Sequence, residues 1–327
     1  MPRVLVTPAM LHETGGPFRD VLENAGFEVV FPVGGLSLMD PVTLQENLDG
    51  IDAVLAGMEP LNRDVLSKVK LRAIARMGVG YDAIDVPAAT EFGVPVTITP
   101  GTNEPSVAEQ TLALIFGVLR GLPERAREVR SGHWLRQTLP RLEGKTLGLI
   151  GLGRIGKALV PKAQGLGLTV IAYDPFVAPK LADELDVRMC SFDELLEEAY
   201  IVSLHCPLND DTRNLIDGDA LARMQVGSVL INAARGGMVD EEALAEALRR
   251  GHLLGAGLDV FEIEPLPLDS PLLGLDNIVL TPHMGGLDHE SQVAMSRLAA
   301  ECIVHLYQGT WPEGCVVNDE LRDGWKW

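Results

Sequence analysis

The chain has 327 residues, of which 46% are hydrophobic and 22% are charged, and its formal net charge is −19. This length is enough for two domains of ordinary size, each with its own hydrophobic core. The composition is that of a globular protein, and the acidic balance argues against nucleic acid or an anionic membrane as a partner. A small anionic ligand would need a local group of arginines or backbone N–H groups to hold it.

The four cysteines, Cys190, Cys206, Cys302 and Cys315, are widely spaced, and the sequence contains neither a CxxC pair nor a Cys/His metal spacing. This pattern is typical of reduced thiols in a cytoplasmic protein without a bound metal. The N-terminus lacks a long apolar core followed by a cleavage site, so we expect no signal peptide. We also expect no membrane span, because no run of 18 uninterrupted apolar residues occurs.

Short apolar runs alternate with helical patterns over the first hundred residues, as they do in βαβ units. Residues 18–24 have a helical pattern, and Gly26 follows it. The expected strands are residues 4–7, 28–31, 51–55, 71–76 and 94–97. These runs predict a parallel sheet.

The same alternation restarts after one long helical segment, Pro105–Arg120, and the chain has a further helical segment at Glu290–Tyr307. The expected strands of this second part are Thr146–Ile150, Thr169–Tyr173, Ile201–Leu204, Val229–Asn232, Gly255–Asp259 and Ile278–Leu280. Six strands with intervening helices describe a doubly wound sheet. Two successive α/β parts predict two Rossmann-like domains, with turn residues at Pro100-Gly101-Thr102 near the boundary.

A glycine-rich turn follows the expected strand 146–150 and opens a helical run. It reads Gly151-Leu152-Gly153-Arg154-Ile155-Gly156, which is the GxGxxG pattern of dinucleotide-binding units. In that pattern the first glycine makes the tight turn, the second lets a pyrophosphate approach the backbone, and the third lets helix and strand pack closely. The phosphates then bind at the helix N-terminus.

Asp174 lies 21 residues after Gly153, at the end of the next expected strand. A carboxylate at that place accepts hydrogen bonds from ribose hydroxyls and repels a 2′-phosphate, so the sequence favours NAD over NADP. Lys180, the next charged residue, keeps NADP open. The alternative interpretation is a set of helix-packing glycines with an unrelated aspartate in a turn.

Three polar residues, Arg235, Glu264 and His283, each follow one of the late strands. The carboxyl ends of the strands in a doubly wound sheet border the ligand crevice, so we expect these side chains to face the same ligand. Reduction of a 2-keto acid needs a proton donor, and histidine suits that task near neutral pH. A neighbouring carboxylate stabilises the imidazolium, and an arginine can grip the substrate carboxylate with two hydrogen bonds.

Each of the three residues also has a simpler interpretation when it is considered alone. A histidine after a strand is more often a capping or core residue. An arginine before two glycines could bind phosphate or lie on the surface, and a glutamate before proline could lie in a solvated turn. Their joint placement downstream of a nucleotide-binding unit favours catalysis.

Taken together, these motifs resemble those of the D-isomer-specific 2-hydroxyacid dehydrogenase family, and within it the phosphoglycerate dehydrogenase-like members. The resemblance covers nearly the whole chain. Besides the glycine-rich turn and Asp174, the matching segments are Arg76–Asp82, Asn103, Val107–Glu109, His205–Leu208 with Thr212, Asn232–Asp240, Gly257–Pro265 and Thr281–Gly286.

The resemblance implies an α/β fold of two Rossmann-like doubly wound parallel-sheet domains, with the active site in the cleft between them. Residues 1–101 with 286–327 would form a flavodoxin-like substrate-binding (catalytic) domain, and residues 102–285 would form a Rossmann domain that binds NAD. The implied activity is the NAD-dependent interconversion of a D-2-hydroxy acid and its 2-keto acid by hydride transfer, with D-3-phosphoglycerate as one candidate substrate.

The resemblance also implies roles for individual residues. The catalytic residues would be Arg235, Glu264 and His283. Cofactor contacts are expected at Gly151, Gly153, Arg154, Ile155, Gly156, Asp174, His205, Cys206, Pro207, Thr212, Ala233, Ala234, Arg235, Asp259, His283 and Gly285. Substrate contacts are expected at Arg76, Gly78, Val79, Gly80, Asn103, Arg235 and His283, with the backbone N–H groups of residues 78–80 forming an anion nest.

One departure from the phosphoglycerate dehydrogenase pattern concerns the substrate. Arg76 and Arg136 match positions that contact substrate phosphate in those enzymes. A further arginine just after the third strand is missing, since the chain reads Leu55-Ala56-Gly57-Met58. An unphosphorylated acid, as in a glyoxylate or hydroxypyruvate reductase, therefore stays open.

Three other functions of the same fold fit the sequence to different degrees. An NAD-sensing binding protein of the corepressor type stays open, because such relatives can retain the same three polar residues. Formate oxidation is disfavoured by Glu264, since formate enzymes carry glutamine there. The motifs leave phosphite oxidation open.

Residues 123–141 are rich in charge and contain Trp134. Members of the resembled family are typically dimers built on this region, so we expect a homodimer in which this segment is an arm that contacts the second subunit. The alternative is a surface loop that covers its own domain.

Overall fold

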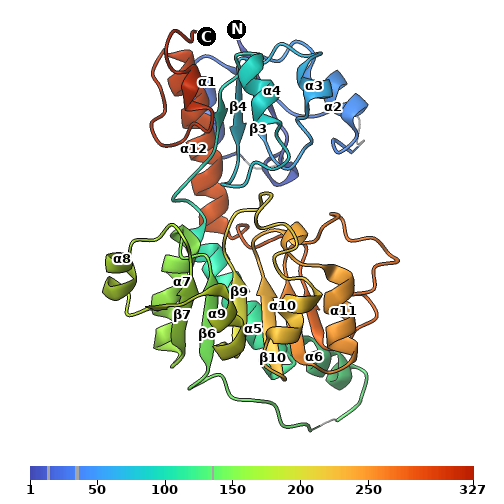
Figure 1. The fold of residues 1–327 in the computed structure, drawn as a ribbon. Coiled ribbons are helices and arrows are strands. Elements are labelled where there is room, and N and C mark those ends of the chain that lie inside the picture. Colours follow the sequence, from blue (N-terminus) through green and yellow to red (C-terminus); the bar gives the residue numbers. More distant parts are fainter. Residues whose placement is uncertain (13–14, 34–36, 135) are drawn as a thin grey trace. The chain divides into compact units, whose positions relative to one another are not determined.

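The computed structural model describes residues 1–12, 15–33, 37–134 and 136–327. The chain divides into two compact units, which Figure 1 shows in the colours of the sequence. Unit 1 consists of Met1–Asn103 and Leu287–Trp327, and unit 2 consists of Glu104–Gly286. Each unit contains a parallel sheet between helices, which confirms the predicted fold class of two Rossmann-like sheets.

The sheet of unit 1 has five parallel strands in the order β2-β1-β3-β4-β5. The strands are β1 (Arg3–Val6), β2 (Glu28–Val30), β3 (Ala53–Ala56), β4 (Ala73–Arg76) and β5 (Val96–Thr97). Each overlaps one of the five strands expected from the sequence. The order is that of a flavodoxin-like doubly wound sheet, in which the carboxyl ends of all strands meet at one edge.

Helices cover both faces of the unit 1 sheet. They are η1 (Ala9–Leu11), α1 (Pro17–Asn24), α2 (Pro41–Leu48), α3 (Arg63–Leu66), α4 (Val86–Glu91), α12 (His289–Tyr307) and η3 (Asp319–Leu321). Successive side chains of a strand point to opposite faces. Accordingly, Val4 and Val6 belong to a core with α1 and α12, whereas Leu5 belongs to a core with α2, α3 and α4. The last long helix of the chain, α12, therefore packs against one face of the sheet formed by the first hundred residues.

An aromatic cluster joins the last residues of the chain to α12. The rings of Phe27, Tyr307 and Trp327 pack edge to face, with centroid distances of 4.9, 5.3 and 5.7 Å. Trp325 lies 6.4 Å from Trp327 and 6.0 Å from Trp311. Edge-to-face pairs are favourable beyond the burial of their area, so this cluster fixes the end of the chain against unit 1.

The sheet of unit 2 has seven parallel strands in the order β12-β11-β10-β9-β6-β7-β8. The strands are β6 (Thr146–Ile150), β7 (Thr169–Tyr173), β8 (Arg188–Met189), β9 (Ile201–Leu204), β10 (Ser228–Asn232), β11 (Leu253–Leu258) and β12 (Ile278–Leu280). Six of them overlap predicted strands. The seventh, β8, has only two residues at the edge of the sheet and no apolar run that could have revealed it. The order reverses between β6 and β9, which is the topological switch point of a Rossmann sheet.

Two helical layers enclose the unit 2 sheet. The helices are α5 (Glu104–Arg120), α6 (Leu122–Arg130), α7 (Arg154–Gly165), α8 (Pro179–Glu184), α9 (Phe192–Glu198), α10 (Gly218–Arg223), η2 (Gly236–Met238) and α11 (Glu241–Arg249). One core contains buried residues of α5, α7 and α8, and the other contains those of α9, α10 and α11. A glycine in β11 permits the close packing of α5, because a Cβ at Gly257 would lie 2.9 Å from Leu114 Cβ.

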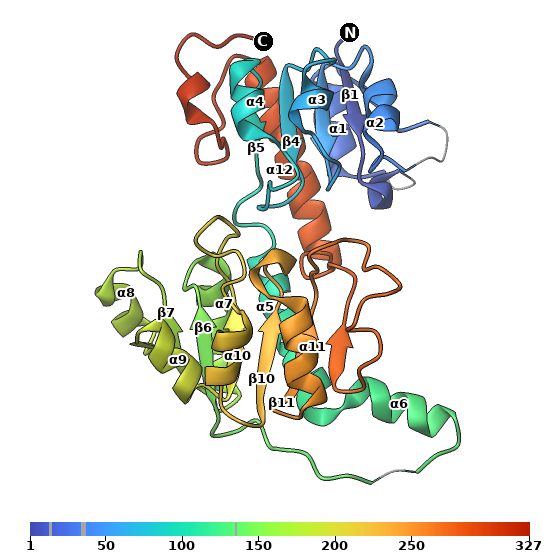
Figure 2. The same ribbon diagram turned by 45° about the vertical axis from the view of Figure 1, so that its right-hand side comes forward.

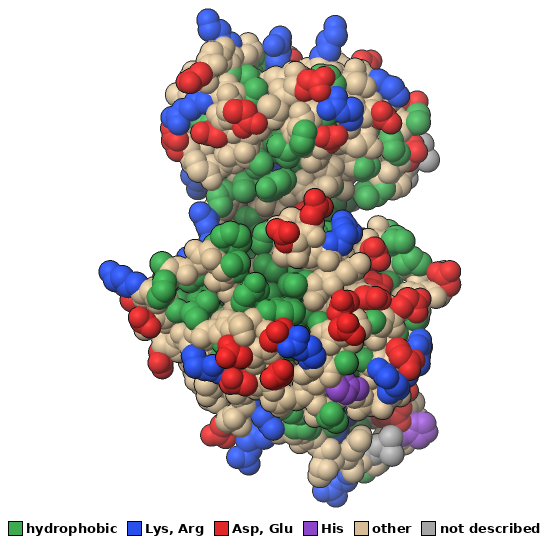
Figure 3. All heavy atoms as spheres, in the orientation of Figure 1, with side chains coloured by type: hydrophobic (Ala, Val, Ile, Leu, Met, Phe, Trp, Pro, Cys, Tyr) green, Lys and Arg blue, Asp and Glu red, His purple; other side chains and the backbone are tan. Residues whose placement is uncertain are grey.

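On the face shown in Figure 3, acidic side chains are spread over both units with basic ones among them. Over the ranges described above, no helix is both long enough and apolar enough to cross a membrane. The same ranges contain no group of three or more His, Cys, Asp or Glu side chains that could hold a metal ion.

Candidate functional site

The glycine-rich turn connects β6 to α7, and its three glycines meet different surroundings. The backbone of Gly151 is left-handed, with φ +101°, and a Cβ there would lie 2.7 Å from the carbonyl carbon and oxygen of His205. A Cβ at Gly156 would lie 2.6 Å from Gly151 O. In contrast, a Cβ at Gly153 would have no described heavy atom within 4 Å. The turn is thus tight at its first and third glycines and open at its second, as a dinucleotide-binding turn requires.

The N-terminus of α7 follows this open glycine directly. Gly153 is its N-cap, and no side chain of the described residues caps the first turn of this 12-residue helix. Asp174, after β7, accepts hydrogen bonds from Leu152 N–H (2.8 Å) and Phe176 N–H (2.9 Å). Arg154, in the first turn of α7, lies 3.8 Å from Glu104. Unpaired N–H groups at a helix N-terminus, next to an aspartate, can hold a pyrophosphate and the adjoining ribose.

The segment after β9 contains His205, Cys206, Pro207 and Thr212, which were predicted to contact the cofactor. Burial lowers the pKa of His205 to about 4, so its imidazole is neutral, and it hydrogen-bonds to Ser203 Oγ at 2.8 Å. Burial raises the pKa of Cys206 to about 11, which suppresses the reactive thiolate. Thr212 Oγ1 donates to Pro207 O at 2.7 Å and holds the turn together. Cys206 therefore behaves as a packing residue.

His283 and Glu264 form a hydrogen-bonded pair at the carboxyl edge of the unit 2 sheet. His283 Nδ1 lies 2.7 Å from Glu264 Oε2, and both side chains are about one-third exposed or less, at 27% and 30%. Glu264 Oε1 accepts Phe261 N–H at 3.0 Å. Burial alone would raise the pKa of Glu264. The hydrogen bond and charge of His283, the Phe261 N–H and the charge of Arg235 together outweigh burial, so this pKa lies below its ordinary value.

Asp259 holds the loop that presents His283. Its buried carboxylate accepts Gly285 N–H at 2.7 Å and Met284 N–H at 3.0 Å, and its carbonyl accepts His283 N–H at 2.7 Å. The hydroxyl of Thr281 also donates to this carboxylate. These bonds fix a left-handed backbone at His283, with φ +51°, which a residue other than glycine rarely adopts.

Arg235 lies in the loop after β10, next to the segment that leads to Glu264. Asn232 shapes this loop, since its Oδ1 accepts Ala234 N–H (3.0 Å) and its Nδ2 donates to Arg235 O (2.8 Å). A Cβ at Gly236 would overlap the backbone of Phe261 and Glu262. The two loops can approach this closely only because residue 236 has no side chain.

The structure thus brings the three predicted catalytic residues to one edge of one sheet. It also shows three supporting residues that the sequence reasoning missed. Gln110 Nε2 donates to Thr281 Oγ1 at 2.9 Å and reaches Asp259 Oδ1 at 3.4 Å. Gly236 permits the approach of the two loops. Gly236 and Thr281 lie inside two segments that matched the family pattern, Asn232–Asp240 and Thr281–Gly286, although neither residue was given a role, whereas Gln110 had no signal of its own.

Four predicted substrate residues of unit 1, Arg76, Gly78, Val79 and Gly80, lie at the end of β4 and in the loop that follows it. The Arg76 guanidinium folds over Gly78, which has φ +134°, and its Nη2 lies 2.9 Å from Met58 Sδ. Gly78 N–H already donates to Thr99 Oγ1 at 2.8 Å. Of the predicted anion nest, this leaves the N–H groups of Val79 and Gly80 for a ligand.

Asn103 is the last residue of unit 1 before α5. Its side chain is 8% exposed, and Oδ1 is buried without a hydrogen-bond partner among the described residues. A buried hydrogen-bond acceptor without a partner is rare in a folded protein. Such an atom is suited to receive a donor from a ligand.

Comparison with known proteins agrees with these motifs. Residues 112–285 match the family model for the NAD-binding domain of D-isomer-specific 2-hydroxyacid dehydrogenases. A D-3-phosphoglycerate dehydrogenase of Methanocaldococcus jannaschii is 39% identical over 305 residues, which cover 91% of this chain and 58% of that protein. A glyoxylate reductase of Korarchaeum cryptofilum is 39% identical over 84% of this chain and 85% of its own length.

A solved structure has the same fold. The TT0316 protein of Thermus thermophilus is 38% identical, with a TM-score of 0.87 over 96% of this chain and 100% of that chain. The chain spans about half the length of the phosphoglycerate dehydrogenases that it matches. The family predicted from the motifs is confirmed: the chain belongs to the D-isomer-specific 2-hydroxyacid dehydrogenases and carries their NAD-binding domain.

Proposed function

We propose that the chain is an NAD-dependent oxidoreductase that interconverts a D-2-hydroxy acid and its 2-keto acid. The observation that carries this proposal is the 2.7 Å pair of His283 and Glu264, with Arg235 on the adjoining loop. These residues lie in loops that follow strands of the same sheet as β6, the strand that leads into the dinucleotide-type turn. The relatives named above include a D-3-phosphoglycerate dehydrogenase and a glyoxylate reductase, both of which act on acids of this class.

NAD, when bound, supplies or accepts the hydride. Gly153 would let the pyrophosphate approach, the N-terminus of α7 would bind it, and Asp174 would accept the ribose hydroxyls. Asp259 has a different part in this proposal from the cofactor contact expected from the sequence. Because its carboxylate is engaged by the N–H groups of Met284 and Gly285, it serves chiefly to position His283.

His283 moves the proton. Nδ1 of His283 is hydrogen-bonded to Glu264. Nε2 of His283 is therefore the nitrogen that would give a proton to the carbonyl oxygen of the keto acid during reduction and take it back during oxidation. The carboxylate of Glu264 stabilises the imidazolium that the donor form requires.

The substrate would be bound through its carboxylate by cationic side chains and N–H groups. Arg235 would bind it together with the carbonyl oxygen. In unit 1, the N–H groups of Val79 and Gly80, the guanidinium of Arg76 and the side chain of Asn103 are the proposed substrate contacts. We place the reaction in the cytoplasm, in keeping with four free cysteines.

We also propose that two copies associate through α6 and the loop after it. No residue of α6 is buried, while Leu122 and Val129 are each 55% exposed. Figure 2 shows α6 projecting from the body of unit 2. Apolar side chains on a projecting helix of a soluble domain usually mark an interface.

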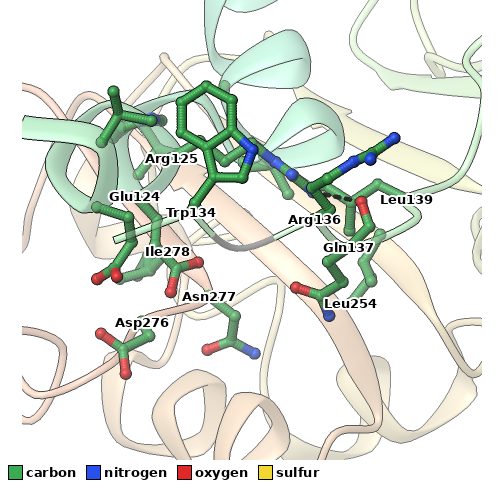
Figure 4. A pocket seen from close by; sticks show the side chains of 17 residues that line it. Glu124, Arg125, Trp134, Arg136, Gln137, Leu139, Leu254, Asp276, Asn277 and Ile278 are labelled. Atoms are coloured by element: carbon green, nitrogen blue, oxygen red, sulfur yellow. Dashed lines mark hydrogen bonds between the residues drawn. The ribbon is translucent and has the colours of Figure 1, made fainter. Parts of the chain in front are cut away.

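A pocket of about 710 Å³ lies beside this helix. Trp134, which is 78% exposed, and Arg136 line it from the loop, and Asn277 and Ile278 line it at the edge strand β12 (Figure 4). A second copy related by a twofold axis would bury the same surface on both subunits. The expected arm also includes Leu135, which lies outside the described residues.

The activity is tested by following NADH oxidation with glyoxylate, hydroxypyruvate and 3-phosphohydroxypyruvate. We expect turnover with at least one acid. His283→Ala should lower kcat by roughly 10²–10⁴-fold, because the proton donor is lost, while the Kd for NADH stays within about threefold in a fluorescence titration. His289→Ala, at an exposed histidine, is the control. Tight NADH binding without any turnover in the wild-type protein would instead favour an NAD-sensing binding protein.

Glu264→Gln should move the alkaline limb of the pH profile for keto-acid reduction to lower pH by about one unit or more. The lowered pKa of Glu264 keeps its carboxylate charged in the neutral range. The neutral amide no longer stabilises the imidazolium, so His283 loses its proton at a lower pH. Glu262→Gln, which makes the same charge change on the same loop, should leave the profile in place. If the pH profile of Glu264→Gln matched that of the wild type, Glu264 would not be the residue that stabilises the imidazolium of His283.

Two glycine substitutions separate folding from cofactor binding. Gly151→Ala should lower the free energy of unfolding by roughly 1–3 kcal/mol, since it combines a left-handed backbone with a clash against His205. Gly153→Ala should unfold like the wild type, because its Cβ has room, yet weaken NADH binding by on the order of tenfold by occupying the space over the turn. Urea unfolding and NADH titration measure the two effects. Unimpaired binding in Gly153→Ala would place the pyrophosphate elsewhere.

The oligomer is tested by light scattering of Val129→Glu. We expect the wild type at the mass of a dimer and the variant at the mass of a monomer, because a buried charge opposes association. Val42→Glu introduces the same charge at an exposed valine of α2 and should remain dimeric. A wild-type monomer, or a dimer in both variants, contradicts this interface.

A further inference from the structure

Glu59 is a buried carboxylate at the carboxyl edge of the unit 1 sheet. It follows β3, and only 9% of the residue is exposed. Its Oε2 accepts Gly57 N–H at 2.7 Å. A Cβ at Gly57 would lie 3.0 Å from Oε1 and 3.3 Å from Oε2, so the carboxylate lies flat against the backbone that follows β3. A glutamate is rarely this buried unless a cation pairs with it.

The usual compensation for such a charge is missing. None of the ion pairs in the described ranges includes Glu59. Thr7 Oγ1 shares Gly57 N–H at 3.0 Å, but Thr7 donates its own hydroxyl to Leu55 O. The structure therefore provides one hydrogen bond to Oε2 and, from the described residues, none to Oε1. The second oxygen is available to a donor on a ligand.

The nearest strand neighbour carries the opposite charge. β3 and β4 are paired, with Ala56 opposite Arg76. The Arg76 guanidinium folds over Gly78 and lies against Met58, the residue before Glu59. Two adjacent loops of the same edge thus carry one guanidinium and one carboxylate, which form no ion pair with each other among the described contacts.

We propose that Glu59 determines the substrate class by disfavouring 2-keto acids with a second anionic group at C3. The favoured class is a short acid whose tail is absent or ends in a hydroxyl. This inference rests on the proposed function, in which loops at this edge bind the substrate. A phosphate placed there would be repelled by the carboxylate, whereas a hydroxyl could donate to Oε1.

A simpler role for Glu59 is to cap Gly57 N–H within the turn. Glutamine has the same shape and keeps an oxygen acceptor for that N–H, but it has no charge. Glu59→Gln therefore separates the two roles. If the residue only caps the turn, the variant treats all acids alike. If the charge selects the substrate, the variant changes its discrimination between acids.

The experiment measures kcat/KM with NADH for glyoxylate, hydroxypyruvate and 3-phosphohydroxypyruvate at low ionic strength. We expect wild-type protein to prefer hydroxypyruvate over its phosphorylated form. Glu59→Gln should raise the ratio of kcat/KM for 3-phosphohydroxypyruvate to that for glyoxylate by on the order of tenfold, mainly through KM. Added salt should shrink the difference. Glu46→Gln, which removes the same charge from an exposed residue of α2, should leave the ratio unchanged.

Thermal unfolding checks that each variant is folded. Glu59→Ala, which removes both the charge and the cap, is the second variant and should shift the ratio in the same direction. A wild type that prefers the phosphorylated acid, or an equal change for all acids in Glu59→Gln, overturns this inference while the reaction class stands. Absence of turnover with every acid overturns the proposed function itself, and the inference falls with it.

Discussion

The buried carboxylate of Asp259 is the constraint on which the unit 2 site depends. Its side chain and its carbonyl together bind the N–H groups of three consecutive residues, 283 to 285. A left-handed backbone costs a residue other than glycine on the order of 1–3 kcal/mol, and it persists only when the surroundings over-determine it. Asp259 meets this condition and thereby gives His283 a single orientation toward Glu264.

Much of this arrangement could be predicted because it depends on residues next to each other in sequence. Strand runs, the glycine turn and the placement of Arg235, Glu264 and His283 after strands are all local patterns. The rest depends on contacts between distant segments. Gln110 and Asp259 are separated by 149 positions, and the closeness of Gly236 to Phe261 follows from the packing of two loops. The sequence predicted a cofactor contact at Asp259, but nothing local showed that its oxygens also bind the backbone N–H groups of Met284 and Gly285.

The charge of the chain and the charge of its proposed ligands have the same sign. With a net charge of −19, the protein as a whole repels an acid or a dinucleotide. At short range, local donors attract the anionic ligand in spite of this repulsion. The backbone N–H groups at the start of α7 and at Val79 and Gly80 carry partial positive charge. These groups do not depend on side-chain ionisation, so anion binding by them is insensitive to pH. Cationic side chains are then needed only where the ligand must be oriented, as at Arg235.

The aromatic cluster of unit 1 has a spectroscopic consequence. Of the four tryptophans, Trp311, Trp325 and Trp327 lie in or beside that cluster, while Trp134 is the single indole of unit 2 and is 78% exposed. Packed indoles emit at shorter wavelength than solvated ones. The blue part of the intrinsic emission therefore reports on the tail and α12, and the red part reports on the surroundings of the α6 loop. Edge-to-face indoles also couple as excitons, so near-ultraviolet circular dichroism follows the C-terminal cluster independently of the dinucleotide-binding unit.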